Sequence, residues 1–196
     1  PELSAKERAD YTKIAYDKAI RLEELIEEFF SIAKYNLSDT VIETETVNLS
    51  IMLAQISYEF MPLYQEKNLN CLTQITENLK VQIDINQFER VFDNLIRNAI
   101  NYSIENSDII IGARQENDDI IITVSNAIDK NKTYNIDHIF EPFVRLDESR
   151  NSKTGGSGLG LAITKKIVEL HHGTISAAID DGRITFTIKL PTVRFL

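Results

Sequence analysis

The chain has 196 residues, 43% of them hydrophobic, and a formal net charge of −9 at pH 7. This hydrophobic fraction is sufficient for a buried core, and the negative charge argues against binding to the phosphate backbone of nucleic acid. The single cysteine, Cys71, excludes an internal disulfide and a cysteine metal cluster.

The sequence contains no apolar run of the length of a membrane span and no signal-peptide pattern. It opens at Pro1 without an initiator methionine. We therefore expect a piece of a longer protein, attached to a membrane only through N-terminal segments outside these residues.

The first predicted element is one long amphipathic helix over residues 4–36. Ser4 and Glu7 have the spacing of a capping box, which marks a helix N-terminus. Apolar residues then recur at helical spacing: Ile14, Leu22, Leu25, Ile26, Phe29, Ile32 and Ala33. A helix with such a stripe requires a partner helix or a second copy of the chain, unless it packs back on its own domain.

A polar segment over residues 37–46 predicts a domain boundary, which divides the chain into 1–40 and 41–196. Residues 47–68 have a helical pattern, capped by Asn48 or Ser50, and Pro62 inside it predicts a kink or an end. A strongly patterned helix is expected over residues 86–103.

Short apolar runs between and after these helices predict strands. They cover residues 69–76, 79–83, 107–115, 119–125, 173–179 and 183–190. Turn residues at 116–119 and 180–182 favour two hairpins. The elements predict an α+β fold, in which helices lie on one side of a mixed, mostly antiparallel sheet.

The most informative segment is KTGGSGLGL at residues 153–161, which runs directly into a helical pattern. Glycines let backbone N–H groups approach an anion, and a helix N-terminus adds free donors, so a phosphate site is expected around 156–161. A Walker loop is excluded because Leu161 and Ala162 follow Gly160. A dinucleotide-binding fingerprint is also excluded, because it requires a strand directly before the glycines and the segment there is polar. Glycines that merely cap a helix remain the structural alternative.

Asn94 and Asn98 stand four residues apart on the helix predicted over 86–103 and therefore share a face. Amide oxygens suit Mg²⁺, which takes few protein ligands together with water and nucleotide phosphates. Tyr102, one turn further on, could lie against an adenine ring. Solvated helix polarity is the alternative explanation for two asparagines alone.

Three segments together resemble the sequence boxes of sensor histidine kinases. FERVFDNLIRNAINYS resembles the N box, IFEPFVRLD (139–147) the F box and TGGSGLGLAI (154–163) the G2 box, in the order typical of the family. The resemblance covers residues 47–196 and implies a two-layer α/β sandwich, the Bergerat or GHKL fold that gyrase, Hsp90 and MutL share. Residues 4–36 resemble the second helix of the kinase dimerisation domain. Within the family, the chain is similar to the VanS-type sensors of vancomycin resistance.

The resemblance implies binding of ATP and Mg²⁺ and assigns roles to individual residues. Asn98 would coordinate Mg²⁺, Asn94 would assist catalysis near the phosphates, and Arg145 would reach the terminal phosphates. Residues 146–155 would form the ATP lid. The implied nucleotide contacts are Asn94, Asn98, Tyr102, Asn126, Arg145, Lys153, Gly156, Gly158, Leu159, Gly160 and Leu161.

Two features depart from the family pattern. In the G1 box, usually DxGxG, Asn126 stands at the Asp position, and Ile128 and Lys130 replace glycines. An Asn oxygen can still accept a hydrogen bond from the adenine amino group, although more weakly than a carboxylate. The phosphoacceptor motif is also missing, because His138, His171 and His172 all lie outside such a pattern.

The expected function is therefore that of the ATP-binding part of a histidine kinase, without autokinase activity of its own. The intact kinase would be a membrane homodimer that passes phosphate from its histidine to an aspartate of an OmpR/PhoB-type, VanR-like response regulator. One alternative is a conformational ATPase like Hsp90 or MutL, which carry an acidic base where Asn94 stands here. Another is an interaction module that has lost nucleotide because of its G1 loop.

Overall fold

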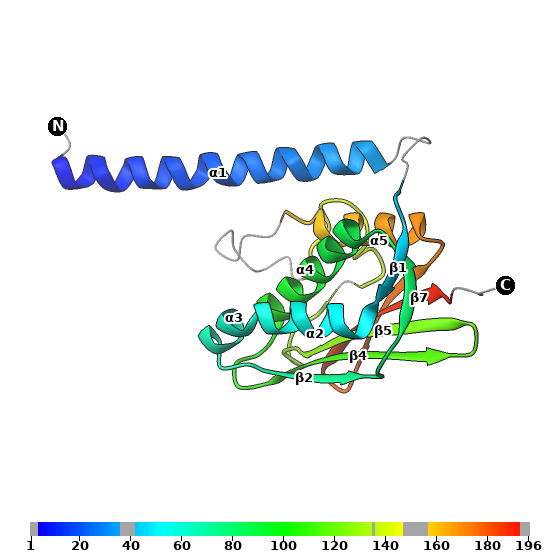
Figure 1. Ribbon diagram of the computed structural model, residues 1–196. Coiled ribbons are helices and arrows are strands. Elements are labelled where there is room, and N and C mark those ends of the chain that lie inside the picture. The colour runs from blue at the N-terminus through cyan, green and yellow to red at the C-terminus, as the bar shows by residue number, and fades with distance from the viewer. Residues whose placement is uncertain (1–3, 36–41, 135, 147–156, 193–196) are drawn as a thin grey trace. The chain divides into compact units, whose positions relative to one another are not determined.

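A computed structural model describes residues 4–35, 42–134, 136–146 and 157–192 (Figure 1). The chain divides into two compact units, Pro1–Thr40 and Val41–Leu196. Lys153, Gly156 and the expected lid from residue 147 onward lie outside the described residues. None of the described helices has an apolar stretch of the length that a membrane span requires.

The first unit contains the helix α1 (Ala5–Tyr35), as predicted. Its capping box is confirmed, because the Ser4 N–H donates to Glu7 Oε2 at 2.8 Å and the Glu7 N–H donates to Ser4 Oγ at 3.2 Å. These bonds lower the pKa of Glu7. Large apolar side chains on α1 are exposed: Tyr11, Ile14, Tyr16, Leu22, Ile26, Phe29 and Phe30. A partner for this helix remains a prediction.

The second unit is built on a five-stranded sheet in the order β2-β4-β5-β7-β6. These strands are β2 (Asn70–Ile75), β4 (Asp108–Glu116), β5 (Asp119–Ala127), β6 (Thr174–Asp180) and β7 (Arg183–Pro191). Only the β2–β4 pair is parallel among these, and the hairpins β4–β5 and β6–β7 are antiparallel. The predicted mixed, mostly antiparallel sheet is confirmed.

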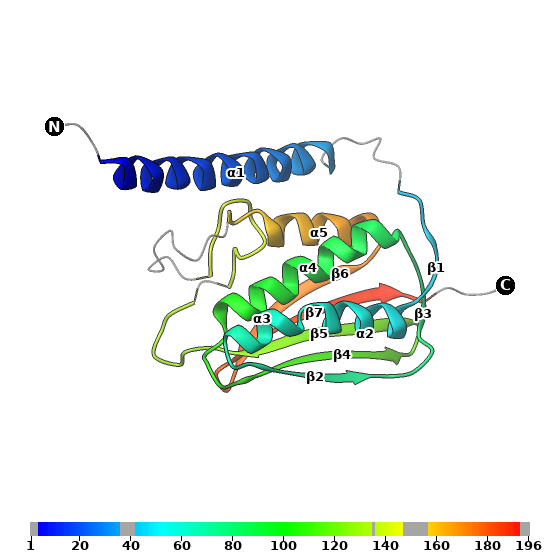
Figure 2. The same ribbon diagram turned by 60° about the vertical axis from the view of Figure 1, so that its left-hand side comes forward.

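Three helices cover one face of this sheet: α2 (Leu49–Glu59), α4 (Ile85–Tyr102) and α5 (Gly160–Leu170) (Figures 1 and 2). Alternate residues of the strands point toward the helices, so Ile111, Val124 and Phe186 are buried opposite the apolar face of α4. That face contributes Phe88, Val91, Phe92, Leu95, Ile96 and Ala99, all nearly inaccessible to solvent. The two-layer α+β prediction is therefore confirmed.

The prediction of a single helical segment over residues 47–68 was wrong, because the region contains the end of a strand and two helices. Its first residues belong to strand β1 (Glu45–Asn48), which pairs antiparallel with β3 (Lys80–Ile83) in a separate two-stranded sheet. The remainder divides at Phe60 into α2 and the short helix α3 (Met61–Glu66), whose first turn accommodates Pro62. Asn48 is the N-cap of α2 and accepts from the Ile51 N–H at 3.2 Å.

His171 joins the two central helices. It is the C-cap of α5, and its Nδ1–H donates to the Ile167 carbonyl of the same helix at 2.8 Å. Its Nε2 accepts from the N–H of Asp84, which lies at the start of α4, at 3.0 Å. The ring stands edge-on to Phe88. Burial lowers the pKa of His171, and the two bonds require the neutral ring.

Candidate functional site

The predicted polar residues of α4 lie beside the start of α5. Asn94 Nδ2 donates to the Gly160 carbonyl at 3.1 Å and to Thr164 Oγ1 at 3.4 Å. Asn98 is half-buried one turn further along α4, on the same helix face. A Cβ on Gly160 would lie 3.2 Å from Asn94 Oδ1, so a glycine lets the two helices approach here. The structure thus brings the N-box and G2-box segments into direct contact.

The N-terminus of α5 is arranged to leave backbone donors available. The helix begins at Gly160, and the N-cap residue, Leu159, makes no side-chain cap hydrogen bond. The Leu159 side chain is almost completely buried and its own N–H donates to Ser157 Oγ at 3.0 Å, which fixes the approach of the chain to the helix. An uncapped helix N-terminus with this geometry suits an anionic group.

Gly158 is held against the F-box segment. Its φ of +76° lies in the left-handed region, and its carbonyl accepts from the Phe143 N–H at 2.9 Å. A Cβ at this position would lie 2.7 Å from the Phe143 carbonyl carbon and 2.8 Å from its Cα. Phe143 itself has a φ of +68°. This close approach therefore requires glycine at position 158.

The F-box segment is anchored to the sheet by apolar contacts. Ile139 and Leu146 are buried, and the Phe140 ring packs edge-on against Phe186 of β7 at a centroid distance of 6.3 Å. Arg145 is half-buried in the same segment. His138 directly precedes the F-box segment, and its Nδ1 bonds Oε1 of Glu141 at 2.7 Å. This interaction raises the pKa of His138.

Asn126 provides a buried acceptor at the end of β5. Its side chain is almost completely buried, and Oδ1 has no hydrogen-bond donor among the residues that the structure describes. The Ile104 N–H donates to the Ala127 carbonyl at 3.2 Å, so the chain just beyond Tyr102 lies next to this strand end. A buried unpaired oxygen costs about 1–3 kcal/mol, and a ligand N–H would recover that cost. The amino group of an adenine fits this acceptor.

The two residues that replace the G1 glycines pack against the β6–β7 turn. Ile128 is buried and its N–H donates to the Gly182 carbonyl at 2.8 Å. Lys130 Nζ bonds Asp181 Oδ1 at 2.6 Å, and its aliphatic chain passes over Gly182. These contacts fix the exit of β5 in place of a flexible glycine loop.

The described part of the chain contains no group of three His, Cys, Asp or Glu side chains that could hold a metal ion. A magnesium ion here would need an amide oxygen, such as that of Asn98, together with water and ligand phosphates. Tyr102 and Leu161 are half-buried in the last turn of α4 and the first turn of α5. The donor set fits a nucleotide-bound ion better than a metal site built from protein alone.

Sequence reasoning missed two residues that shape the site. Thr164 is fully buried and contacts Asn94; a polar residue beside Ile163 on the inward face of α5 was the available signal. Phe143 contacts Gly158 through its backbone, and the residue is 64% exposed. Its left-handed backbone has no sequence signal, because phenylalanine rarely adopts it.

Residues 83–194 match the model of the family described as histidine kinase-, DNA gyrase B- and HSP90-like ATPases, and the chain belongs to this family. Domains of this family bind ATP, usually with Mg²⁺. Within the family, the predicted likeness to VanS-type sensor kinases is confirmed.

Sensor protein VanSC of Enterococcus gallinarum is 46% identical over 191 residues, which cover 97% of this chain and 53% of that protein. Sensor protein VanS of Enterococcus faecium is 40% identical over 195 residues, which cover 98% of this chain and 50% of that protein. The chain thus spans about half the length of these relatives.

Solved structures of histidine kinases share the fold. The nucleotide-free catalytic domain of ThkA is 26% identical with a TM-score of 0.66, and the match covers 77% of this chain and 97% of that one. Histidine kinase AdeS of Acinetobacter baumannii has a TM-score of 0.76 at 20% identity, over 99% of this chain and 88% of that one. The second likeness concerns the fold alone.

Proposed function

We propose that residues 41–196 bind Mg·ATP and position its terminal phosphate for transfer to a histidine of a sensor kinase. The observation that carries the proposal is the contact of Asn94 with Gly160 at the uncapped start of α5. It brings the amide side chain of α4 next to a helix N-terminus whose free backbone donors suit a phosphate. The unpaired Asn126 oxygen adds a matching acceptor for adenine.

Each part of the site would then bind one part of the nucleotide. Asn126 Oδ1 accepts from the adenine amino group, and Tyr102 flanks the base. The Asn98 amide oxygen binds Mg²⁺, and Asn94 acts near the phosphates. The phosphates would bind to the glycine-loop residues Gly156, Gly158, Leu159, Gly160 and Leu161. A role of Lys153 and of the lid in covering the phosphates stays a prediction, because Gly156, Lys153 and the lid from residue 147 onward lie outside the described residues.

ATP supplies the phosphoryl group, and the protein contributes mainly orientation and charge stabilisation. Gly160 and Thr164 hold the Asn94 amide in a fixed orientation. Arg145, on the segment anchored by Ile139 and Leu146, stabilises the negative charge on the transferring group. Loss of Arg145 should therefore slow transfer more than it weakens binding.

The acceptor histidine would lie on a dimerisation-domain helix outside these residues. His171 is buried and both its ring nitrogens are bonded, and His138 is paired with Glu141, which argues against either as acceptor. His172 follows the end of α5 in an exposed turn. Residues 1–40 would be the second dimerisation helix, and the chain alone would lack autokinase activity.

The signalling context is proposed from the relatives. The names of VanSC and VanS support a sensor of the vancomycin-resistance type, which as a full-length homodimer would lie in the cell membrane. A kinase of the same fold, ThkA, has been solved with the response regulator TrrA. A VanR-like regulator of the OmpR/PhoB type, which carries the acceptor aspartate, would be the corresponding partner here.

The direct test is phosphoryl transfer in trans. The chain is incubated with γ-labelled ATP and Mg²⁺, with and without a dimerisation domain taken from VanSC. We expect label on the added domain and none on the chain alone, and Arg145→Ala should lower the transfer rate at least about tenfold while ATP affinity changes less than about threefold. ATP hydrolysis without transfer would favour the Hsp90-like alternative. Absence of ATP binding would favour an interaction module.

A further inference from the structure

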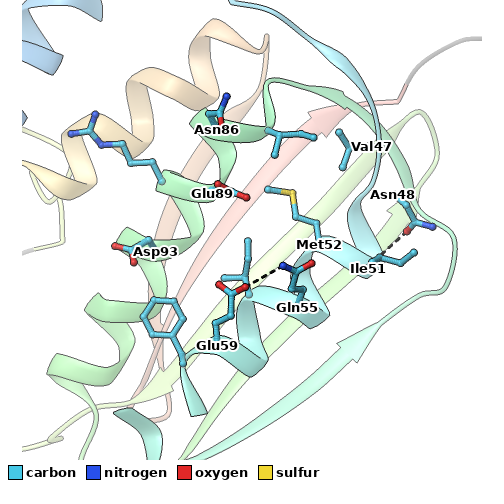
Figure 3. A pocket seen from close by; sticks show the side chains of 13 residues that line it. Val47, Asn48, Ile51, Met52, Gln55, Glu59, Asn86, Glu89 and Asp93 are labelled. Atoms are coloured by element: carbon cyan, nitrogen blue, oxygen red, sulfur yellow. Dashed lines mark hydrogen bonds between the residues drawn. The ribbon is translucent and has the colours of Figure 1, made fainter. Parts of the chain in front are cut away.

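A groove of about 670 Å³ lies between α2 and the first half of α4 (Figure 3). Its apolar floor is formed by Met52 and Ile56 of α2, by Phe60 at the C-cap of that helix, and by Ile85 of α4. Ile51 extends this apolar surface to the rim, where the residue is 64% exposed. The volume is that of a ligand pocket, and the apolar floor offers burial to an incoming side chain.

The groove is distinct from the candidate nucleotide site. Asn94 contacts Gly160 and Thr164 of α5, whereas Glu89 and Asp93 line the groove toward α2. The two sites therefore use different faces of one helix, and a ligand in the groove leaves the Asn94–Gly160 contact in place.

Acidic side chains surround the apolar floor. The lining includes three carboxylates, Glu59, Glu89 and Asp93, and one guanidinium, Arg90. The Gln55 amide donates to Glu59 Oε1 at 3.1 Å, and Figure 3 shows Glu59 and Glu89 projecting from facing helices. The groove therefore combines an apolar floor with an excess of negative charge.

At the Phe60 end of the groove, Arg97 contacts both Asp93 and the Phe60 ring. Arg97 pairs with Asp93 at 2.8 Å, and its guanidinium carbon lies 5.2 Å from the centre of the Phe60 ring. This arrangement occupies Asp93 and leaves Glu59 and Glu89 as the carboxylates best placed to meet a ligand. Met52 on the floor is a flexible side chain that adapts to different apolar groups.

We propose that this groove binds a cationic amphipathic peptide segment of a protein partner. One apolar side chain of the segment enters between Met52 and Ile85, and flanking Lys or Arg residues approach Glu59 and Glu89. Charge complementarity favours a cationic ligand, because these carboxylates repel nucleotides, acidic peptides and anionic lipid surfaces. The exposed Ile51 at the rim adds the apolar surface typical of a protein interface.

The test uses a short fluorescein-labelled, amidated peptide of leucine and lysine in a helical amphipathic pattern, measured by fluorescence anisotropy. The comparison peptide carries glutamate in place of lysine. We expect binding of the cationic peptide only, weakened at least about tenfold by Glu59→Gln/Glu89→Gln. Ile51→Asp changes an exposed rim residue and should weaken binding comparably without loss of the fold.

The control variant is Glu77→Gln/Glu105→Gln, which removes the same charge from exposed positions outside the groove. It should change peptide affinity less than about twofold. Equal weakening by both double variants, or binding of the acidic peptide, would overturn the proposal, as would unchanged affinity in Ile51→Asp. Affinity for an ATP analogue, measured in parallel, should stay constant in all variants, so a failure here is distinguishable from a failure of the nucleotide site.

Discussion

Replacement of Gly158 by alanine examines how tightly the glycine loop is fixed. At a φ of +76° an alanine is disfavoured by about 1–2 kcal/mol. Its Cβ would meet the Phe143 backbone at 2.7 to 3.0 Å, and backbone atoms cannot yield as a flexible side chain does. The loop must then separate from Phe143 and lose their 2.9 Å hydrogen bond, which adds about 1 kcal/mol.

The expected total of about 2–3 kcal/mol corresponds to nucleotide affinity weakened roughly 30- to 150-fold, because binding requires the docked loop. Isothermal titration calorimetry with a non-hydrolysable ATP analogue measures this change in affinity. Gly160→Ala is the matched control: the nearest atoms to its Cβ would belong to the Asn94 side chain, from 3.2 Å, and not to backbone, so its effect should be less than about tenfold. Affinity within twofold of wild type in Gly158→Ala would mean that nucleotide binding does not depend on the close contact of Gly158 with Phe143, as would a larger effect in Gly160→Ala.

Three further predictions concern buried polar groups. Asn126→Ala should weaken ATP about five- to tenfold and abolish its preference over ITP in competition binding, because the buried acceptor is lost. His171→Phe should lower the free energy of unfolding at pH 7 by about 1–3 kcal/mol in urea titrations, because the Asp84 N–H loses its acceptor. Thr164→Val should weaken nucleotide binding less than about threefold, since Asn94 keeps its bond to Gly160.

The pH dependence of the His171 effect has a defined sign. Burial lowers the folded-state pKa of His171 below the unfolded value of about 6.5, so the unfolded state binds the proton more readily. The stabilisation by His171 is therefore complete above about pH 6.5 and declines as the pH falls toward the folded-state pKa. A stability difference between wild type and His171→Phe that grows on acidification would contradict this assignment.

An unchanged ratio of ATP to ITP affinity in Asn126→Ala would remove Asn126 from the adenine site. An effect of Thr164→Val as large as that of Asn94→Ala would mean that Thr164, rather than Gly160, holds the Asn94 amide.

Local sequence patterns predicted most of the fold. The period of apolar residues located α4 within one residue at each end, and turn residues located both hairpins. Strand β1 was missed because its four residues lie partly in a polar segment and form a strand only through pairing with β3, far away in sequence. The break at Phe60 was expected from Pro62, but its position depends on packing.

The candidate site was predictable only as a set of residue types. Spacing placed Asn94 and Asn98 on one face, and the glycines indicated a loop before a helix. The contact of Asn94 with Gly160 and Thr164 depends on how two helices pack, which no local pattern encodes. Likewise, Ile128 and Lys130 marked a departure from the family, but their packing on Gly182 emerged only from the fold.

We propose that this chain binds Mg·ATP between α4 and α5. It is tested most directly by calorimetric titration with a non-hydrolysable ATP analogue, with and without Mg²⁺, on wild type and on Asn98→Ala. We expect binding to wild type that requires Mg²⁺ and is weakened in the variant. Absence of binding to wild type, or equal Mg²⁺-dependent binding by both proteins, would contradict it.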